Sequence, residues 1–115
     1  HAAASILSNQ VIAVLDMGYT LLEDCGFTRA EAVRATGQLV MRNIENVLEA
    51  GCDGALTGPI ERNDIETVKK HIACMQNDDS DDVSLYKMLG TKLANIAEKK
   101  NPDKDYTQMM ELLRG

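Results

Sequence analysis

One stretch interrupts an otherwise helical sequence: Leu56-Thr57-Gly58-Pro59-Ile60-Glu61-Arg62-Asn63-Asp64. A proline fixes its own φ and pushes the residue before it out of the helical region, so no helix continues through this stretch. Asn63 is a good N-cap residue, and Glu66, three residues further on, can complete a capping box with it. The sequence therefore predicts a stiff turn, followed by a new helix that starts at Asp64.

The same turn carries a candidate anion-binding group, Arg62. Arg62 lies just outside the predicted helix start, where free backbone N–H groups and the positive end of the helix dipole would meet its guanidinium. Proteins commonly hold a phosphate or a carboxylate with this combination. The alternative is a rigid interhelical turn in which Arg62 pairs with Asp64 or is solvated.

Length and charge limit the class of protein. With 115 residues, of which 44% are hydrophobic, the chain is long enough for a single helical domain (residues 1–115) with a real core. The net charge of -6 and the absence of a Lys/Arg cluster argue against nucleic acid or an anionic membrane as the main partner. We therefore expect a soluble domain whose partners are proteins or small molecules.

The cysteines and the beginning of the chain bear on location. Cys25, Cys52 and Cys74 are an odd number at wide spacings, which indicates neither a disulfide framework nor a metal site, but free thiols in a reducing cytoplasm. We expect no membrane-spanning helix, which would need an apolar run of roughly 20 residues. The sequence also lacks a basic start followed by an apolar core, so we expect no signal peptide. Because His1 already lies inside a helical pattern, we interpret the chain as a fragment of a longer protein.

The sequence pattern from about Ala2 to Cys25 predicts one long helix. Gly26 would end this helix as a C-terminal cap in the left-handed conformation. Its apolar arc is wide, and Asp16 is the only formal charge between His1 and Leu22, so we expect burial on most sides. A narrow polar stripe runs along this helix, interrupted by an isoleucine. It comprises His1, Ser5, Ser8, Asn9, Asp16 and Tyr19. Such a stripe either lines a cleft or bonds to neighbouring helices and to the preceding turn.

Four further helices are predicted. Thr28 and Glu31 form a capping box at the start of the second, which runs to Gly51, and Gly37 in its middle predicts the close approach of another helix. The others span about 64–75, 82–100 and 106–113. Each has an expected apolar face: Val33, Val40, Ile44, Val47 and Leu48 in the second; Ile65, Val68, Ile72 and Met75 in the third; Leu85, Leu89, Leu93 and Ile96 in the fourth; Met109, Met110 and Leu113 in the last. No strand signal appears, so the fold class is all-α, a bundle of about five helices with the first at its centre.

A second polar row lies on the third helix. Asp64, Thr67 and His71 recur at i, i+3 and i+7 along the border of its apolar face, where the lip of a cleft would lie. A histidine at the border of an apolar face is also commonly a structural residue whose ring nitrogens form hydrogen bonds, without a catalytic role. We expect this row and Arg62 to meet the polar stripe of the first helix in one cleft, because unpaired polar groups at buried borders are costly.

One set of residues carries a resemblance to a known family. It consists of Thr57-Gly58-Pro59-Ile60, Arg62, Asp64, Thr67-Val68 and His71, with the opening His1-Ala2-Ala3-Ala4 and Ser8-Asn9. These residues resemble the C-terminal helical domain of a family of Rossmann-like oxidoreductases of unassigned substrate, related to pyrroline-5-carboxylate reductase, 6-phosphogluconate dehydrogenase and ketopantoate reductase. The resemblance covers most of the chain and fades in the last helix. Asn63 stands where the family more often has Gly, and Asn also tolerates a positive φ. No Gly-x-Gly-x-x-Gly turn is present, so the nucleotide-binding domain of the family is missing from this chain.

The resemblance implies a fold like the C-terminal domain of 6-phosphogluconate dehydrogenase and a function in an NAD(P)-dependent oxidoreductase. The domain would close over a cofactor bound mainly by the N-terminal Rossmann domain of the parent protein, and would form a homodimer. Alone it would bind no cofactor and be inactive. By the resemblance, the catalytic candidates are His71, Asp64 and Asn9, and the substrate-binding candidates are Ser5, Thr57, Gly58, Pro59, Arg62 and Thr67.

The resemblance also implies a role for each group. Ser5 and Asn9 would hold the substrate or its reactive carbonyl or imine, Arg62 would hold an anionic group, and His71 or Asp64 would move a proton or orient Arg62. The alternative is a helical protein-interaction module with no catalytic role. The sequence leaves open the substrate and the choice between NAD and NADP.

Overall fold

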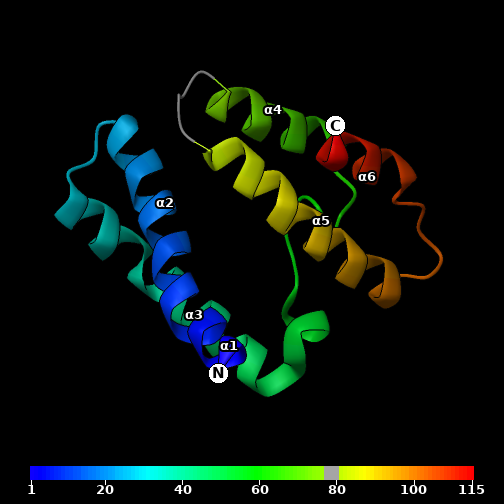
Figure 1. Ribbon diagram of the computed structural model, residues 1–115, viewed down its shortest axis with the longest axis horizontal. Helices are drawn as coiled ribbons and strands as arrows, with labels where there is room; N and C mark the ends of the chain where they lie inside the picture. The colour runs from blue at the N-terminus through cyan, green and yellow to red at the C-terminus, as the bar shows by residue number, and fades with distance from the viewer. Residues whose placement is uncertain (77–80) are drawn as a thin grey trace. The chain divides into compact units, whose positions relative to one another are not determined.

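The computed structural model describes residues 1–76 and 81–115, which are helical throughout apart from the connections (Figure 1). The elements are α1 (Ala2–Ser5), the π-helical turn η1 (Ile6–Gln10), α2 (Val11–Asp24), α3 (Arg29–Ala55), α4 (Ile65–Met75), α5 (Asp82–Lys100) and α6 (Thr107–Arg114). Because α1, η1 and α2 follow one another without a break, the described residues form five helical segments and no strand. This confirms the prediction of an all-α chain.

The chain divides into two compact units, His1–Arg42 and Asn43–Gly115. Helix α3 belongs to both, and it is interrupted inside the second unit at Gly51, where φ is 78° and ψ is 173°. A positive φ of this kind favours glycine. The predicted end of the second helix at Gly51 is therefore a kink, after which one further helical turn continues to Ala55.

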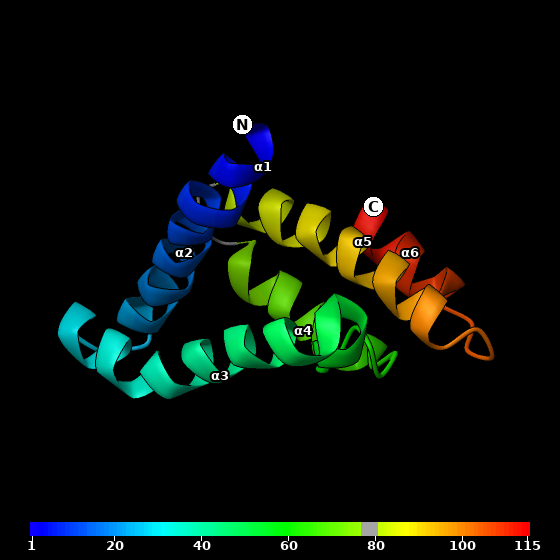
Figure 2. The same cartoon turned by 90° about the horizontal axis from the view of Figure 1, so that it is seen from below.

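Local hydrogen bonds shape the first unit at the connection from α2 to α3. Gly26 has a φ of 104°, and the N–H of Phe27 donates to the carbonyl of Leu22 at 3.2 Å, which closes the end of α2. The Thr28 N–H donates to Glu31 Oε1 at 2.9 Å, and the Glu31 N–H donates to Thr28 Oγ1 at 3.1 Å. Both predicted caps are thus confirmed. From this connection α2 and the first part of α3 diverge (Figure 2).

Arg29, the first residue of α3, ties this helix to α2. Its guanidinium pairs with Asp16 at 3.0 Å and with Glu23 at 2.8 Å, and it donates to Thr20 Oγ1 at 3.2 Å. It also lies over the ring of Tyr19, 5.6 Å from the ring centre. One half-buried guanidinium therefore makes most of the polar contacts between the two helices in the described chain.

Burial of the first helix is not observed. Within the described chain no residue from Ala2 to Asp24 is buried, and Leu7 is 78% exposed. The prediction that this helix is buried on most sides is therefore wrong for the described residues, whereas its place at the centre of the bundle stays a prediction. An apolar pattern shows which surface avoids water, but it does not show whether the covering surface belongs to the same chain.

Helix α3 departs from prediction in the same way. Among its described residues only Ala32 is buried, and Leu48 is 80% exposed, so the expected core face of this helix is open. A Cβ placed on Gly37 would meet nothing within 4 Å, so the predicted close approach of another helix there is also wrong. A glycine in a helix permits close packing but does not require it.

The continuous helix Ala2–Asp24 has 23 residues and a mean hydropathy of 1.2, so by length and composition alone it is able to cross a membrane. This corrects the expectation that no apolar run approaches the length of a span. Core helices of soluble proteins and signal sequences share these properties, which makes the finding weak evidence. The absence of a membrane partner stays a prediction.

The hydrophobic core lies in the second unit, where α4, α5 and α6 contact one another pairwise (Figure 1). Buried side chains of α4 and α6 include Val68, Ile72, Met109 and Leu113, which confirms the predicted apolar faces of both helices. Ile60, from the turn before α4, packs into the same core. The interrupting turn is thereby fixed to the best-packed part of the chain.

Helix α5 buries a different face from the one predicted. Its buried residues are Gly90, Ala94 and Ala97, whereas Leu93 lies on the exposed side. A Cβ on Gly90 would lie 2.8 Å from Leu113 Cδ2 and 3.2 Å from Ile60 Cδ1, so small residues are needed for this close packing. The prediction of Leu85, Leu89, Leu93 and Ile96 as the core face is wrong, because residue size rather than hydrophobicity selected the packed side.

Candidate functional site

The turn that carries most of the candidate residues is a single helical turn closed at Asn63. The Asp64 N–H donates to the Pro59 carbonyl at 2.8 Å, the Asn63 N–H donates to the Ile60 carbonyl at 3.1 Å, and Asn63 has a φ of 61°. These two bonds around a left-handed residue are the Schellman arrangement that ends a helix. Asn63 therefore ends one helical turn in a left-handed conformation that asparagine tolerates.

The next helix starts one residue later than predicted. Asp64 is the N-cap and α4 begins at Ile65, so the predicted N-cap at Asn63 is wrong. Glu66 pairs with Lys69 at 3.7 Å instead of completing a capping box. Asparagine is favoured both at helix N-caps and at left-handed helix ends, so the local sequence did not distinguish the two uses.

Asp64 and Thr67 form one hydrogen-bonded pair at the start of α4. Asp64 accepts from the Thr67 hydroxyl at 2.7 Å and from the Thr67 N–H at 3.2 Å. The Thr67 hydroxyl and then the Thr67 N–H lower the pKa of the Asp64 carboxyl, and the positive charges of Arg62 and Lys70 act in the same direction. A carboxyl that stays ionised suits a helix cap and an orienting role better than it suits proton donation.

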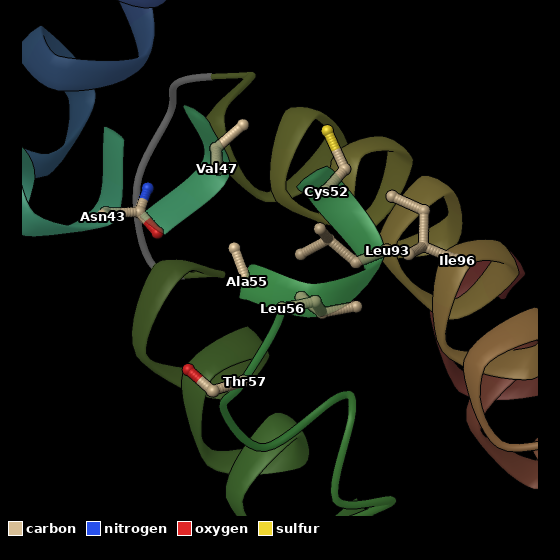
Figure 3. Close-up of a pocket in the computed structure, with 8 residues that line it drawn as sticks. All are labelled: Asn43, Val47, Cys52, Ala55, Leu56, Thr57, Leu93 and Ile96. Atoms are coloured by element: carbon tan, nitrogen blue, oxygen red, sulfur yellow. The ribbon is translucent and has the colours of Figure 1, made fainter. Parts of the chain in front are cut away.

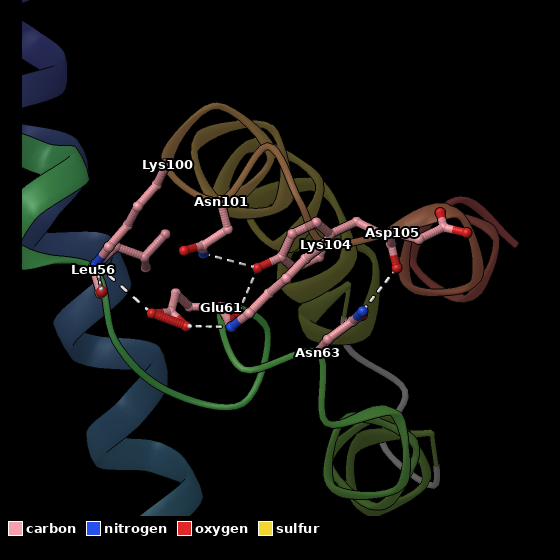
Figure 4. A network of polar contacts seen from close by, with 8 residues as sticks. Leu56, Glu61, Asn63, Lys100, Asn101, Lys104 and Asp105 are labelled. Atoms are coloured by element: carbon pink, nitrogen blue, oxygen red, sulfur yellow. Dashed lines mark hydrogen bonds and ion pairs between the residues drawn. The ribbon is translucent and has the colours of Figure 1, made fainter.

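Lys100 holds the turn from the end of α5 (Figure 4). Its Nζ donates to the Leu56 carbonyl at 2.8 Å and lies 3.7 Å from Glu61 Oε1. Lys104 approaches the other oxygen of Glu61 at 4.0 Å, and the Glu61 side chain is only 16% exposed. The Glu61 side chain therefore faces the interior of the second unit, where the two lysines compensate its negative charge.

The connection between α5 and α6 also holds the turn, and Figure 4 shows its contact between Asp105 and Asn63. The buried Tyr106 hydroxyl donates to the Glu61 carbonyl and accepts from Asn101 Nδ2 at 3.0 Å. Asn63 Nδ2 donates to the Asp105 carbonyl at 2.7 Å, and its buried Oδ1 has no partner among the described residues. The sequence patterns did not predict this network. Its one available signal was Tyr106, since a buried tyrosine needs a partner for its hydroxyl.

Arg62 differs from Glu61, its neighbour in the turn. Its side chain is exposed and makes no hydrogen bond or ion pair with the described residues. The backbone N–H of Arg62 donates to the Gly58 carbonyl at 3.0 Å, and those of Asn63 and Asp64 are also used within the turn. An anion at this place would therefore be held by the guanidinium rather than by a cradle of free N–H groups. Of the two open alternatives for this residue within the turn, the solvated one describes the geometry.

The His71 side chain forms no hydrogen bond or ion pair with another candidate residue in the described chain. Its Nδ1 lies 3.0 Å from the hydroxyl of Tyr86 on α5, and the two rings meet edge to face at 5.9 Å between centres. Burial raises the pKa of the Tyr86 hydroxyl. Tyr86 was not predicted, although a half-buried tyrosine on a helix border is a signal of a hydrogen-bond partner.

Ser5 and Asn9 lie in the first unit. Asn9 is part of the π-helical turn η1, and Ser5 directly precedes this turn. Widened turns of this kind occur often at functional sites. The Ser8 hydroxyl bonds back to the Ala4 carbonyl, and Asp16 and Tyr19 of the same polar stripe meet Arg29. Local bonds therefore satisfy part of the stripe, while the predicted cleft that joins it to the row on α4 stays a prediction.

A cavity of about 320 Å³ lies beside the turn, between the end of α3 and the exposed face of α5 (Figure 3). Its lining is mainly apolar, and Thr57 is the predicted site residue within it. The lining residues are Asn43, Val47, Cys52, Ala55, Leu56, Thr57, Leu93 and Ile96. Gly58, next in the chain, has a φ of 97°, and this glycine and Pro59 turn the chain from the cavity wall into the helical turn.

Comparison with known proteins gives one family. The family model described as "Domain of unknown function (DUF2520)" matches residues 1–93, a range that contains all nine candidate residues and ends within α5. Neither the curated proteins nor the solved structures gave a match. Because the matched range covers most of the 115 residues, the chain belongs to the DUF2520 family.

Proposed function

We propose that this chain is the substrate-side and dimerisation domain of an NAD(P)-dependent oxidoreductase and works together with a Rossmann domain of the parent protein. The observation that carries the proposal is the exposed guanidinium of Arg62 on a turn that is otherwise pinned. Glu61, the neighbouring residue, faces Lys100 and Lys104, whereas Arg62 has no ion-pair partner among the described residues. A fixed turn with one available cation suits the binding of an anionic group of a substrate.

The proposal divides the work between the two domains. The nicotinamide cofactor supplies or accepts the hydride, and the Rossmann domain binds most of it, since this chain has no glycine-rich phosphate turn. Arg62 orients the substrate by its anionic group, and His71 and Asn9 are the candidates for contact with the reacting carbonyl or imine. Asp64 acts at the start of α4 as an ionised cap. The likeness to 6-phosphogluconate dehydrogenase and its relatives rests on the sequence resemblance.

The first test is the reading frame that encodes this chain. We expect a nucleotide-binding domain with a Gly-x-Gly-x-x-Gly turn upstream of His1, and a frame without one contradicts the proposal. Calorimetry with NADPH and NADH then compares the complete protein with the 115-residue chain. The complete protein should bind one of them, and the chain alone should bind neither and have no redox activity.

Dimerisation is proposed for the exposed apolar side of the first helix. Leu7 and Ile12 are large apolar side chains without cover in the described chain, and a second copy is the simplest surface of matching chemistry. Sedimentation should show self-association at micromolar concentration, weakened by Leu7→Gln. Met88→Gln, which changes an equally exposed apolar residue of α5, is the matched control. A monomer at high micromolar concentration is evidence against this part of the proposal.

The same open apolar faces favour a second candidate function, a helical protein-interaction module with no catalytic role. In that case Arg62 and His71 are architectural or solvated. The two functions differ in one measurement on the complete protein. Arg62→Ala should weaken substrate binding in an oxidoreductase, whereas a module should show no nicotinamide-dependent reaction to weaken.

A further inference from the structure

We propose that Tyr86 is a positioning residue that holds His71 in one tautomer, with Nδ1 as an acceptor and Nε2–H as a donor available to a ligand. Tyr86 Oη and His71 Nδ1 are 3.0 Å apart, and the rings meet edge to face with an angle of 85° between their planes. The two residues lie on different helices, α4 and α5, so both backbones fix the pair. The use of this donor by a substrate rests on the proposed function; the tautomer itself does not.

The proposed direction of the hydrogen bond, from Tyr86 to His71, rests on the chemistry of the two groups. Tyr86 is half-buried, and burial raises the pKa of its hydroxyl, so the O–H stays protonated through neutral pH and remains a donor. Among the described residues His71 Nδ1 is its only hydrogen-bond partner. A neutral imidazole has one acceptor and one donor nitrogen. When Nδ1 accepts from Tyr86, the proton of the imidazole is on Nε2.

The environment of Nε2 makes this donor available. His71 is exposed, and no described residue forms a hydrogen bond with Nε2. An Nε2 that already carries a proton cannot act as a general base, but it can donate to a carbonyl or carboxylate oxygen. Of the roles considered for His71, the geometry therefore favours holding a substrate oxygen and disfavours taking a proton from the substrate.

The tautomer can be measured in the 115-residue chain by the ¹⁵N chemical shifts of its imidazole nitrogens. The spectra are recorded at about pH 8.5, above the usual pKa range of histidine side chains, and the exposed His1 serves as an internal reference for an unconstrained ring. We expect His71 to show one tautomer, with an acceptor Nδ1 and a protonated Nε2. Tyr86→Phe should shift His71 toward the mixture seen for His1, and Tyr19→Phe, whose ring packs on Arg29, should leave it unchanged.

Two results would overturn the proposal: a protonated Nδ1 in the unaltered chain, or equal tautomer populations in the unaltered chain and in Tyr86→Phe. The first needs no variant, so it decides the question even where Tyr86→Phe disturbs folding.

In the complete protein, kinetics test the donor role. His71→Ala should raise the KM for the substrate about tenfold, and His71→Gln, which keeps an N–H of similar reach, should restore most of this loss. A collapse of kcat in His71→Gln with unchanged KM indicates a base and overturns the donor role. The absence of any nicotinamide-dependent reaction contradicts the proposed function alone, and the ¹⁵N shifts then still decide the role of Tyr86.

Discussion

The hydroxyl of Tyr106 donates a hydrogen bond to the backbone carbonyl of Glu61, 45 residues earlier in the chain. This bond connects the segment before α6 with the turn before α4, and Asn101 donates to the same hydroxyl from the end of α5. Two connections of the second unit, the turn before α4 and the segment between α5 and α6, therefore meet at one buried oxygen atom. The shape of the turn that carries Arg62 depends on this contact more than on Arg62 itself.

Tyr106→Phe should destabilise the chain. The change keeps the buried ring but leaves the Glu61 carbonyl and Asn101 Nδ2 without this partner, which costs about 1–3 kcal/mol. Urea denaturation followed by circular dichroism measures the loss. Tyr19→Phe is the matched control, because the Tyr19 hydroxyl has no hydrogen bond among the described residues. Equal denaturation midpoints for the two variants would show that the contact adds no stability.

Gly90→Ala and Gly37→Ala should have opposite effects on stability. Both glycines lie inside helices, where alanine is favoured by about 1 kcal/mol. At Gly37 the new Cβ meets nothing within 4 Å, so we expect this gain. At Gly90 it would lie 2.8 Å from a methyl group of the buried Leu113, and overpacking costs about 1–3 kcal/mol. A stabilising Gly90→Ala would contradict the close packing of α5 and α6.

Arg62→Ala and Glu61→Gln, at neighbouring positions, should separate function from stability. Arg62 is exposed and without an ion pair in the described chain, so its loss should change stability by less than about 0.5 kcal/mol. Glu61→Gln weakens the contacts with Lys100 and Lys104 and should cost about 1 kcal/mol. Melting temperatures give the stabilities, and substrate affinity of the complete protein gives the function. A large loss of stability in Arg62→Ala with unchanged affinity would show that Arg62 is architectural.

The pH dependence of stability should reflect three carboxyls at helix starts: Glu31, Asp64 and Asp105. Hydrogen bonds from Thr28, Thr67 and Thr107 respectively lower the pKa of each in the folded state. A lowered folded pKa gives stability that is complete above the unfolded value of about 4 and is lost as the pH falls through the folded pKa. Thermal melts between about pH 6 and pH 2 should therefore show a progressive loss below about pH 4.

A variant of the Asp64 pair gives the corresponding site-specific result. Thr67→Ala removes the stronger of the two hydrogen bonds, so the pKa of Asp64 should rise toward its ordinary value of 3.8. The carboxyl ¹³C shift of Asp64 measures this directly. Thr36→Ala, which removes a hydroxyl bonded to the Ala32 carbonyl, should leave the Asp64 pKa unchanged. An unaltered pKa in Thr67→Ala would rule out the hydroxyl as its main cause.

Apart from the N-cap at Asn63, the capping predictions were correct where the interacting groups lie close together along the chain. The caps at Gly26 and at Thr28 and Glu31 were predicted correctly, because the groups that form them lie within one helical turn of each other. The N-cap at Asn63 was wrong although it is also local. Asparagine serves both ends of a helix, and the Asn63–Asp105 bond, 42 residues apart, belongs to the left-handed arrangement.

By itself, the sequence determined the helices, their approximate ends and the break at residues 56–64, since these depend on backbone preference, proline and capping groups close together in the chain. The tertiary structure alone decided which face of α5 is buried, because close packing selects by volume and the small residues around Gly90 admit Leu113. It also decided the partners of Glu61 and His71. Groups that are 15 and 45 residues apart in the sequence meet only when helices pack, and no local pattern encodes that meeting.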